Sequence, residues 1–67
     1  MDIKRKDLVV FRLPFEEFPR MGEVITIGKR RGTALVGTIG IQERKGKRKL
    51  IEIVETVPLA RIVRKVA

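Results

Sequence analysis

Residues 34–54 read ALVGTIGIQERKGKRKLIEIV, in which a basic run lies between two apolar segments. The flanking segments, 34–41 and 50–54, are rich in Val and Ile, which favour β-strands. Five of the eight residues from Gln42 to Lys49 are cationic: Arg44, Lys45, Lys47, Arg48 and Lys49. The pattern predicts a β-hairpin whose turn projects positive charge into solvent, where long cationic side chains can reach phosphate oxygens.

The same run would also serve as a solvated turn that merely keeps the protein soluble. The composition weighs against that alternative, because the chain has 16 Lys and Arg but only 8 Asp and Glu, which gives a formal charge of +8 on 67 residues. This excess is larger than solubility demands, and it attracts polyanions over a distance. We therefore expect nucleic acid as the partner. A membrane is not expected, because the sequence shows neither a lipidation motif nor a basic helix with a bulky apolar face.

The length and the missing residue types exclude several kinds of chemistry. A chain of 67 residues has room for one small core, so a single domain over 1–67 is expected. Without Cys or His, the chain lacks disulfides, thiolate metal sites and the commonest general base. Ser is also absent, which excludes a Ser or Cys nucleophile. We expect no enzyme, no cofactor and no metal.

Period-2 apolar patterns predict an all-β chain. The four clearest strand segments are 7–13, 23–28, 33–42 and 50–57. Gly37 and Gly40 interrupt the third of them, and glycine within a strand is typical of coiling, a bulge or a close approach. Together these features indicate a sheet that curls into a small barrel.

The first loop, residues 14–22, contains two prolines and a glycine. Its apolar side chains, Phe15, Phe18 and Met21, are expected to fold back onto the core, because so small a core needs its few aromatics. The alternative is that the phenylalanines stack on bases.

The last ten residues fit two structures. Leu59, Ile62, Val63 and Val66 have helical spacing, with Pro58 at a permitted first-turn position. The stretch from Ile62 to Val66 is also rich in β-formers, so a short turn could lead into a fifth strand. We favour the strand and keep a short helix as the alternative.

Five strands, a long first loop, two tight hairpins and a short turn before the last strand resemble a small SH3-like barrel. Residues 19–25 look like the segment that leads into the second strand of such barrels, and residues 57–63 are similar to their last short turn. Residues 31–37 are similar to the Sm-like strand that begins Arg-Gly-x-Leu. The resemblance implies a five-stranded barrel that binds nucleic acid. The Sm signature needs an Asn, which this chain lacks, so it does not imply a uridine-binding ring.

Three further basic clusters are candidates for the same role. They are the turn Lys29, Arg30 and Arg31, the N-terminal Lys4, Arg5 and Lys6, and the tail residues Arg61, Arg64 and Lys65. The terminal clusters would equally serve as solvated surface. If the sheet is up-and-down, the turn at 29–31 and the basic run lie at opposite ends and contact two separate phosphate tracts. If the barrel curves strongly, they form one continuous stripe.

Base-specific recognition has little support, since Trp, Tyr and Asn are absent and Gln42 is the only Gln. Arginine instead suits bidentate phosphate contacts. We therefore expect recognition of backbone and shape in structured RNA, as by a small cytoplasmic ribosomal or ribosome-associated protein. The scarcity of thermolabile residues suits a thermophilic archaeon or a similar source.

Two other functions remain open. A DNA-binding chromatin or regulatory protein would be favoured by Phe15, Phe18 or Met21 exposed at a loop tip, because architectural proteins insert apolar wedges. An adaptor would instead pair an exposed sheet edge with another protein.

Overall fold

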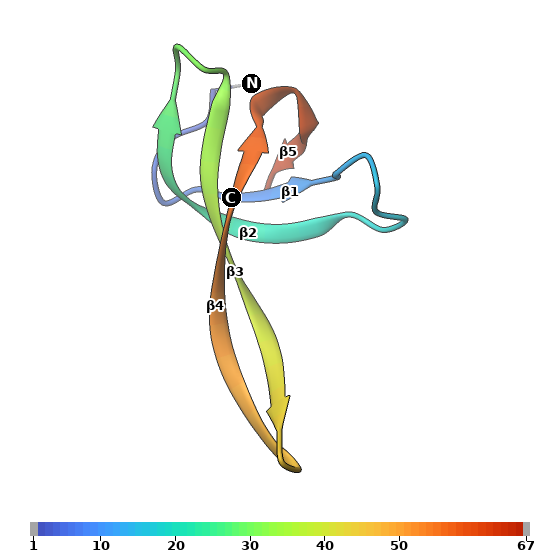
Figure 1. The fold of residues 1–67 in the computed structure, drawn as a ribbon. Helices are drawn as coiled ribbons and strands as arrows, with labels where there is room; N and C mark the ends of the chain where they lie inside the picture. The colour runs from blue at the N-terminus through green and yellow to red at the C-terminus, as the bar shows by residue number, and fades with distance from the viewer. Residues whose placement is uncertain (1, 67) are drawn as a thin grey trace.

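The computed structural model describes residues 2–66 and consists of five antiparallel strands in one sheet (Figure 1). In chain order the elements are β1 (Leu8–Phe11), β2 (Arg20–Gly28), β3 (Thr33–Arg44), β4 (Lys47–Pro58), the 3-10 helix η1 (Leu59–Arg61) and β5 (Ile62–Lys65). The prediction of an all-β chain with five strands is confirmed.

The strands lie in the order β4-β3-β2-β1-β5, so β4 and β5 form the two edges of the sheet. Residues 2–66 therefore form an open, curled sheet, and the closed barrel that the SH3-like resemblance implies is not observed. One reason is strand length: closure would pair the edge strands β5 and β4, and β5 has four residues against twelve in β4. A bulge at Ile25 in β2 shifts the β2–β3 register, whereas pairing through Gly37 and Gly40 is regular.

The core lies on the concave side of this sheet, where alternate residues of the strands point inward. It consists of one aromatic and six aliphatic side chains: Val9, Phe11, Val24, Ala34, Val36, Val57 and Ile62. Phe11 is the largest of them and is fully buried. Along β3 the inward positions are Ala34, Val36 and Thr38, and burial ends at Thr38, whose hydroxyl donates to the Ile53 carbonyl oxygen at 3.4 Å.

Beyond Thr38, β3 and β4 leave the body as a two-stranded arm, which we define as residues 39–52. The β2–β3 ladder ends at the pair Glu23–Gly37, whereas the β3–β4 ladder continues to Arg44–Lys47. The arm gives the molecule its longest dimension, 42 Å against 24 and 23 Å, and points downward in Figure 1. An isolated hairpin is only marginally stable in water, so the arm depends on its attachment to the body.

The basic run is mostly strand, which corrects the eight-residue turn expected from Gln42 to Lys49. The turn consists of Lys45 and Gly46 alone, with φ of 51° and 77°. Positive φ at both central residues is typical of a type I′ turn, whose twist matches that of the flanking strands and lets pairing continue to the tip. The predicted strands at 33–42 and 50–57 were therefore too short.

The second strand also begins earlier than predicted, at Arg20, because this residue pairs with Phe11 of β1. The Arg20 guanidinium lies 5.1 Å from the centre of the Phe11 ring and forms ion pairs with Glu16 and Glu55. These contacts tie the first loop and β4 to the body. The first strand is shorter than the predicted 7–13, ending at Phe11.

The tail forms the favoured fifth strand, and its helical alternative is limited to the three residues of η1. β5 pairs with β1, and two further backbone hydrogen bonds extend this pairing. The Arg12 N–H donates to the Arg61 carbonyl at 3.0 Å, and the Val66 N–H donates to the Leu8 carbonyl at 2.8 Å.

The expectation that the first loop folds back onto the core is wrong. Phe15 is 99% exposed, and Phe18 and Met21 are also exposed. The seven buried side chains already fill the small core, and four partly buried hydrophobic residues cover its margin: Ile3, Leu13, Ile27 and Leu59. The loop aromatics therefore remain in solvent.

Gly22 allows β2 and β3 to approach closely at the point where the sheet curls. A Cβ atom there would lie 2.5 Å from Val36 Cγ1 and 2.7 Å from the Gly37 carbonyl oxygen. We expect Gly22→Ala to lower the free energy of unfolding by about 1–3 kcal/mol, because an added methyl group overpacks the site. Urea denaturation would measure this change. Gly28→Ala is the matched control, since its Cβ would meet no atom closer than 3.5 Å; equal losses in both variants would contradict the prediction.

Candidate nucleic-acid interface

The two faces of the arm differ in charge because paired residues of β3 and β4 share a face. One face, called the inner face, continues the inward positions Val36 and Thr38; the opposite one is the outer face. At the tip, the inner face carries the pairs Gln42–Lys49 and Arg44–Lys47, whereas the outer face carries Glu43–Arg48. The sequence therefore sends most of the basic run to one side of the ribbon.

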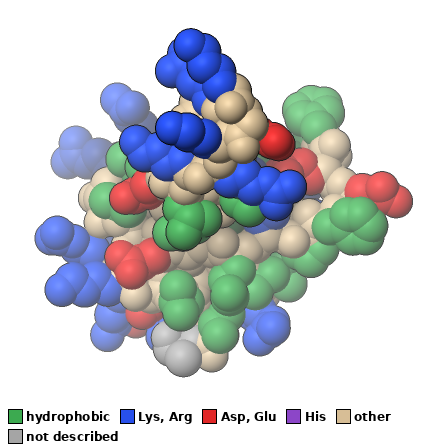
Figure 2. Space-filling view, turned by 90° about the horizontal axis from the view of Figure 1, so that it is seen from below, with side chains coloured by type: hydrophobic (Ala, Val, Ile, Leu, Met, Phe, Trp, Pro, Cys, Tyr) green, Lys and Arg blue, Asp and Glu red, His purple; other side chains and the backbone are tan. Residues whose placement is uncertain are grey.

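A shallow hollow of about 520 Å³ lies at the tip, lined by Gln42, Arg44, Lys45, Lys47 and Lys49. These side chains are exposed, and the lining includes four cations and no carboxylate. Figure 2 views the molecule from below, and Lys and Arg side chains stand out from the arm. Such a cluster can contact several neighbouring phosphates and displace their counterions. Arg48 is the one predicted tip residue that points elsewhere, opposite Glu43.

The turn with Lys29, Arg30 and Arg31 lies at the other end of β3. These residues are exposed in the β2–β3 connection, at the top of Figure 1. The eleven steps from Thr33 to Arg44 correspond to about 36 Å at roughly 3.3 Å per residue. Of the two arrangements left open by the sequence, the structure shows the two-ended one, and the continuous stripe is not observed.

The N-terminal and tail clusters meet at Asp7. The Asp7 carboxylate accepts a hydrogen bond from the Lys4 backbone N–H at 2.8 Å and lies 3.7 Å from Lys65 Nζ. This ion pair offsets part of the positive charge of Lys65. Lys6 is held by its backbone, which donates to the Val24 carbonyl at 2.7 Å. The remaining residues, Arg5, Arg61 and Arg64, are exposed on the body, away from the arm tip.

Phe15 and Phe18, which were expected to pack on the core, are instead candidate contact residues. A turn closed by the Glu16 N–H and the Leu13 carbonyl, together with the Arg20–Glu16 ion pair, holds the loop so that Phe15 faces solvent. The sequence signal is the pair Pro14 and Pro19, which bracket four residues and disfavour a strand between them. An exposed ring can stack on a base or insert between base steps.

We compared the chain with protein-family models, with curated protein sequences and with solved structures, and found no match. Within residues 2–66, no helix is long and apolar enough to cross a membrane. In the same part of the chain, no three acidic side chains lie close enough together to hold a metal ion.

Proposed function

We propose that this protein binds the phosphate backbone of structured RNA, with the hollow at the arm tip as its principal contact. The observation that carries the proposal is the convergence of Arg44, Lys45, Lys47 and Lys49 on one face of an arm that projects from the body. A narrow ribbon can enter a folded RNA, where phosphates from different helices lie close together. The body then stays outside and anchors the arm.

The turn at 29–31 supplies the second contact in this proposal. It lies far enough from the tip to reach a separate phosphate tract, so that the protein bridges two RNA helices. This two-ended arrangement suits a small ribosomal or ribosome-associated protein, which stabilises the RNA fold without reading its bases. The element order, with a short 3-10 turn before the last strand, supports membership of the SH3-like class.

A DNA-binding chromatin or regulatory role is the second candidate, and the exposure of Phe15 favours it. An aromatic ring at a loop tip can act as a wedge that bends a duplex. The major groove of B-DNA also admits a two-stranded ribbon, which the arm supplies. The adaptor function stays a prediction, for which the two sheet edges, β4 and β5, are available.

Binding to a folded ribosomal RNA fragment, duplex DNA and single-stranded RNA across a salt series tests these proposals. Contacts to about four to six phosphates should give a log-log slope of roughly −4 to −5 on duplex DNA. Preference for folded RNA that persists at high salt supports the RNA proposal. Equal or tighter binding to duplex DNA supports the second candidate. No binding to any of the three near physiological salt contradicts both and favours the adaptor.

A further inference from the structure

The outer face of the arm carries hydrophobic side chains that the proposed function does not use. Ile39, Ile41 and Leu50 are 74%, 67% and 69% exposed. In Figure 2, hydrophobic side chains are open to solvent beside the arm, with acidic side chains among them. Contiguous exposed apolar surface marks an interaction site more often than a free surface. An arm of this kind gains stability if its apolar face is covered.

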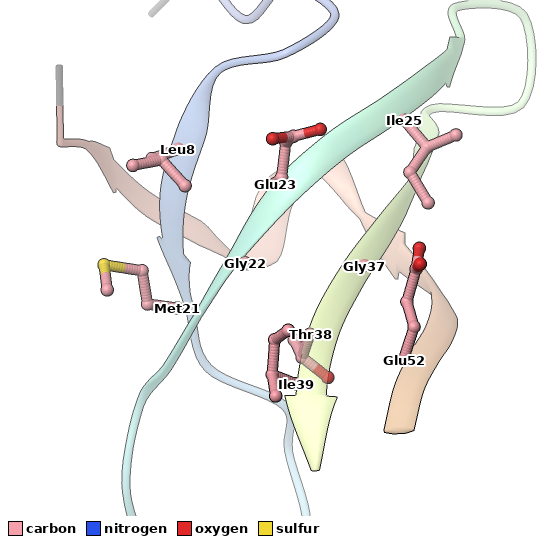
Figure 3. Close-up of a pocket in the computed structure, with 9 residues that line it drawn as sticks. All are labelled: Leu8, Met21, Gly22, Glu23, Ile25, Gly37, Thr38, Ile39 and Glu52. Atoms are coloured by element: carbon pink, nitrogen blue, oxygen red, sulfur yellow. The ribbon is translucent and has the colours of Figure 1, made fainter. Parts of the chain in front are cut away.

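The same face is hollowed at the root of the arm, where Gly37 has no side chain. The hollow has a volume of about 500 Å³, and its lining includes Leu8, Met21, Ile25 and Ile39 (Figure 3). Glu23 and Glu52 also line it, and both are labelled in Figure 3. The root is therefore apolar and acidic, in contrast to the basic tip.

On the outer face, the two charged residues of β4 flank Leu50, with Arg48 on the side of the tip and Glu52 on the side of the body. The central row is the apolar pair Ile41–Leu50. One row toward the tip is the pair Glu43–Arg48, and one row toward the body is Ile39–Glu52. Rows on one face are two residues apart, about 6.6 Å, so Arg48 and Glu52 lie at equal distances on either side of Leu50 on the same strand.

We propose that the outer face binds a second copy of this chain, in a two-fold symmetric dimer whose arms run antiparallel. The symmetry axis lies between the two arms, parallel to the Ile41–Leu50 row and perpendicular to the strands. This operation places the β4 strands opposite each other, so that Arg48 of each copy faces Glu52 of the other. Two sheets packed face to face lie about 10 Å apart, a gap that Arg and Glu side chains can bridge.

Charge complementarity favours a second copy of the chain, and not a nucleic acid, as the partner of the outer face. Glu23 and Glu52 repel phosphates, whereas the interface supplies each Glu52 with an arginine and buries the central hydrophobic row. The β4 charges of this face are self-complementary, as a two-fold interface requires. The inner faces point outward from this dimer, and the two basic hollows lie at opposite ends of it. The inference goes beyond the proposed function and needs only the outer face.

Sedimentation velocity on nucleic-acid-free full-length protein, from about 1 µM to 1 mM, tests the dimer. We expect a concentration-dependent dimer for the natural sequence. Leu50→Lys should weaken it at least about tenfold, because a charge enters the centre of an apolar interface. Phe15→Lys is the matched control, because it also replaces an exposed hydrophobic residue with a positive charge but lies off the outer face. It should leave the dimer unchanged. Circular dichroism checks that each variant is folded.

A charge exchange tests the arrangement of the two copies. Arg48→Glu and Glu52→Arg should each weaken the dimer by about tenfold, since each creates two like-charge contacts by symmetry. Combining them should restore the dimer to within a few-fold. Arg48→Glu also places two carboxylates side by side within the hairpin, at positions 43 and 48. This effect is present in both the single and the double variant, so recovery of the dimer in the double variant reports the contact between copies. A monomer at every concentration, an unaffected Leu50→Lys dimer, or no recovery in the double variant would overturn the proposal. None of these measurements involves nucleic acid, so they are independent of the binding series.

Discussion

Replacing Arg44, Lys45, Lys47 and Lys49 with Glu should abolish binding to structured RNA while leaving the sheet folded. All four side chains are exposed and line the hollow at the arm tip, so their loss removes no core contact. Four phosphate contacts contribute a salt slope of about −3.6, which corresponds to a loss on the order of 100-fold or more near 0.1 M salt. Fluorescence anisotropy across a salt series measures both the affinity and the slope.

The four reversals also lower the formal charge from +8 to 0, since each removes two charges. A control variant separates this general effect from the loss of the site. Reversing Lys4, Arg5, Arg61 and Arg64 makes the same change in net charge at exposed positions on the body. We expect this control to weaken binding much less and to keep most of the salt slope. Equal losses in the two variants would show that net charge alone, and not the arm tip, carries the binding.

Phe11→Ala should unfold the protein, or leave it folded only at low temperature. Phe11 is the largest buried side chain and the one aromatic of the core. Removing a buried Phe ring costs about 3–5 kcal/mol, which is as much as a core of this size supplies in total. The variant also removes the ring that lies against the Arg20 guanidinium, which joins Glu16 of the first loop to Glu55 of β4.

Thermal unfolding followed by circular dichroism measures this effect. Phe11→Leu keeps much of the buried volume and provides a folded variant whose smaller loss can be quantified. Phe15→Ala removes the same ring from an exposed position and should change the free energy of unfolding by no more than about 0.5 kcal/mol. A Phe11→Ala variant as stable as Phe15→Ala would contradict the assignment of the core.

Local sequence patterns predicted the strands and the tail because both depend on short-range preferences. The runs of Val and Ile disfavour helix and pair readily, so the five strands and the order of the hairpins follow from them. The strand ends were less predictable. A Lys-Gly pair is a weak turn signal, and the six polar residues that flank it in 42–49 resemble a loop. The type I′ turn in the structure shows instead that strand pairing continues to Arg44 and Lys47.

The buried face of β3 could not be predicted, because both faces of this strand are apolar. The bulkier set, Leu35, Ile39 and Ile41, looks like the better core face, yet the structure buries the smaller Ala34 and Val36. The concave side of a strongly curled sheet leaves little room, and small side chains fit it. The large ones then remain on the outside, where the arm exposes Ile39 and Ile41.

The sequence alone determined the positive charge, the β-strands and the exclusion of Ser, Cys and His chemistry, because these follow from residue types and from contacts between near neighbours. The tertiary structure alone decided where that charge gathers. The attachment of the ribbon to the body decides which of its two sides is the inner face. The β2–β3 ladder runs from the pair Gly28–Thr33 to the pair Glu23–Gly37 and ends there, which leaves residues 39–52 free as an arm. Pairing across β3 and β4 then gathers Arg44, Lys47 and Lys49 on the inner face and sends Arg48 to the outer one. Lys45 of the turn joins the three at the hollow.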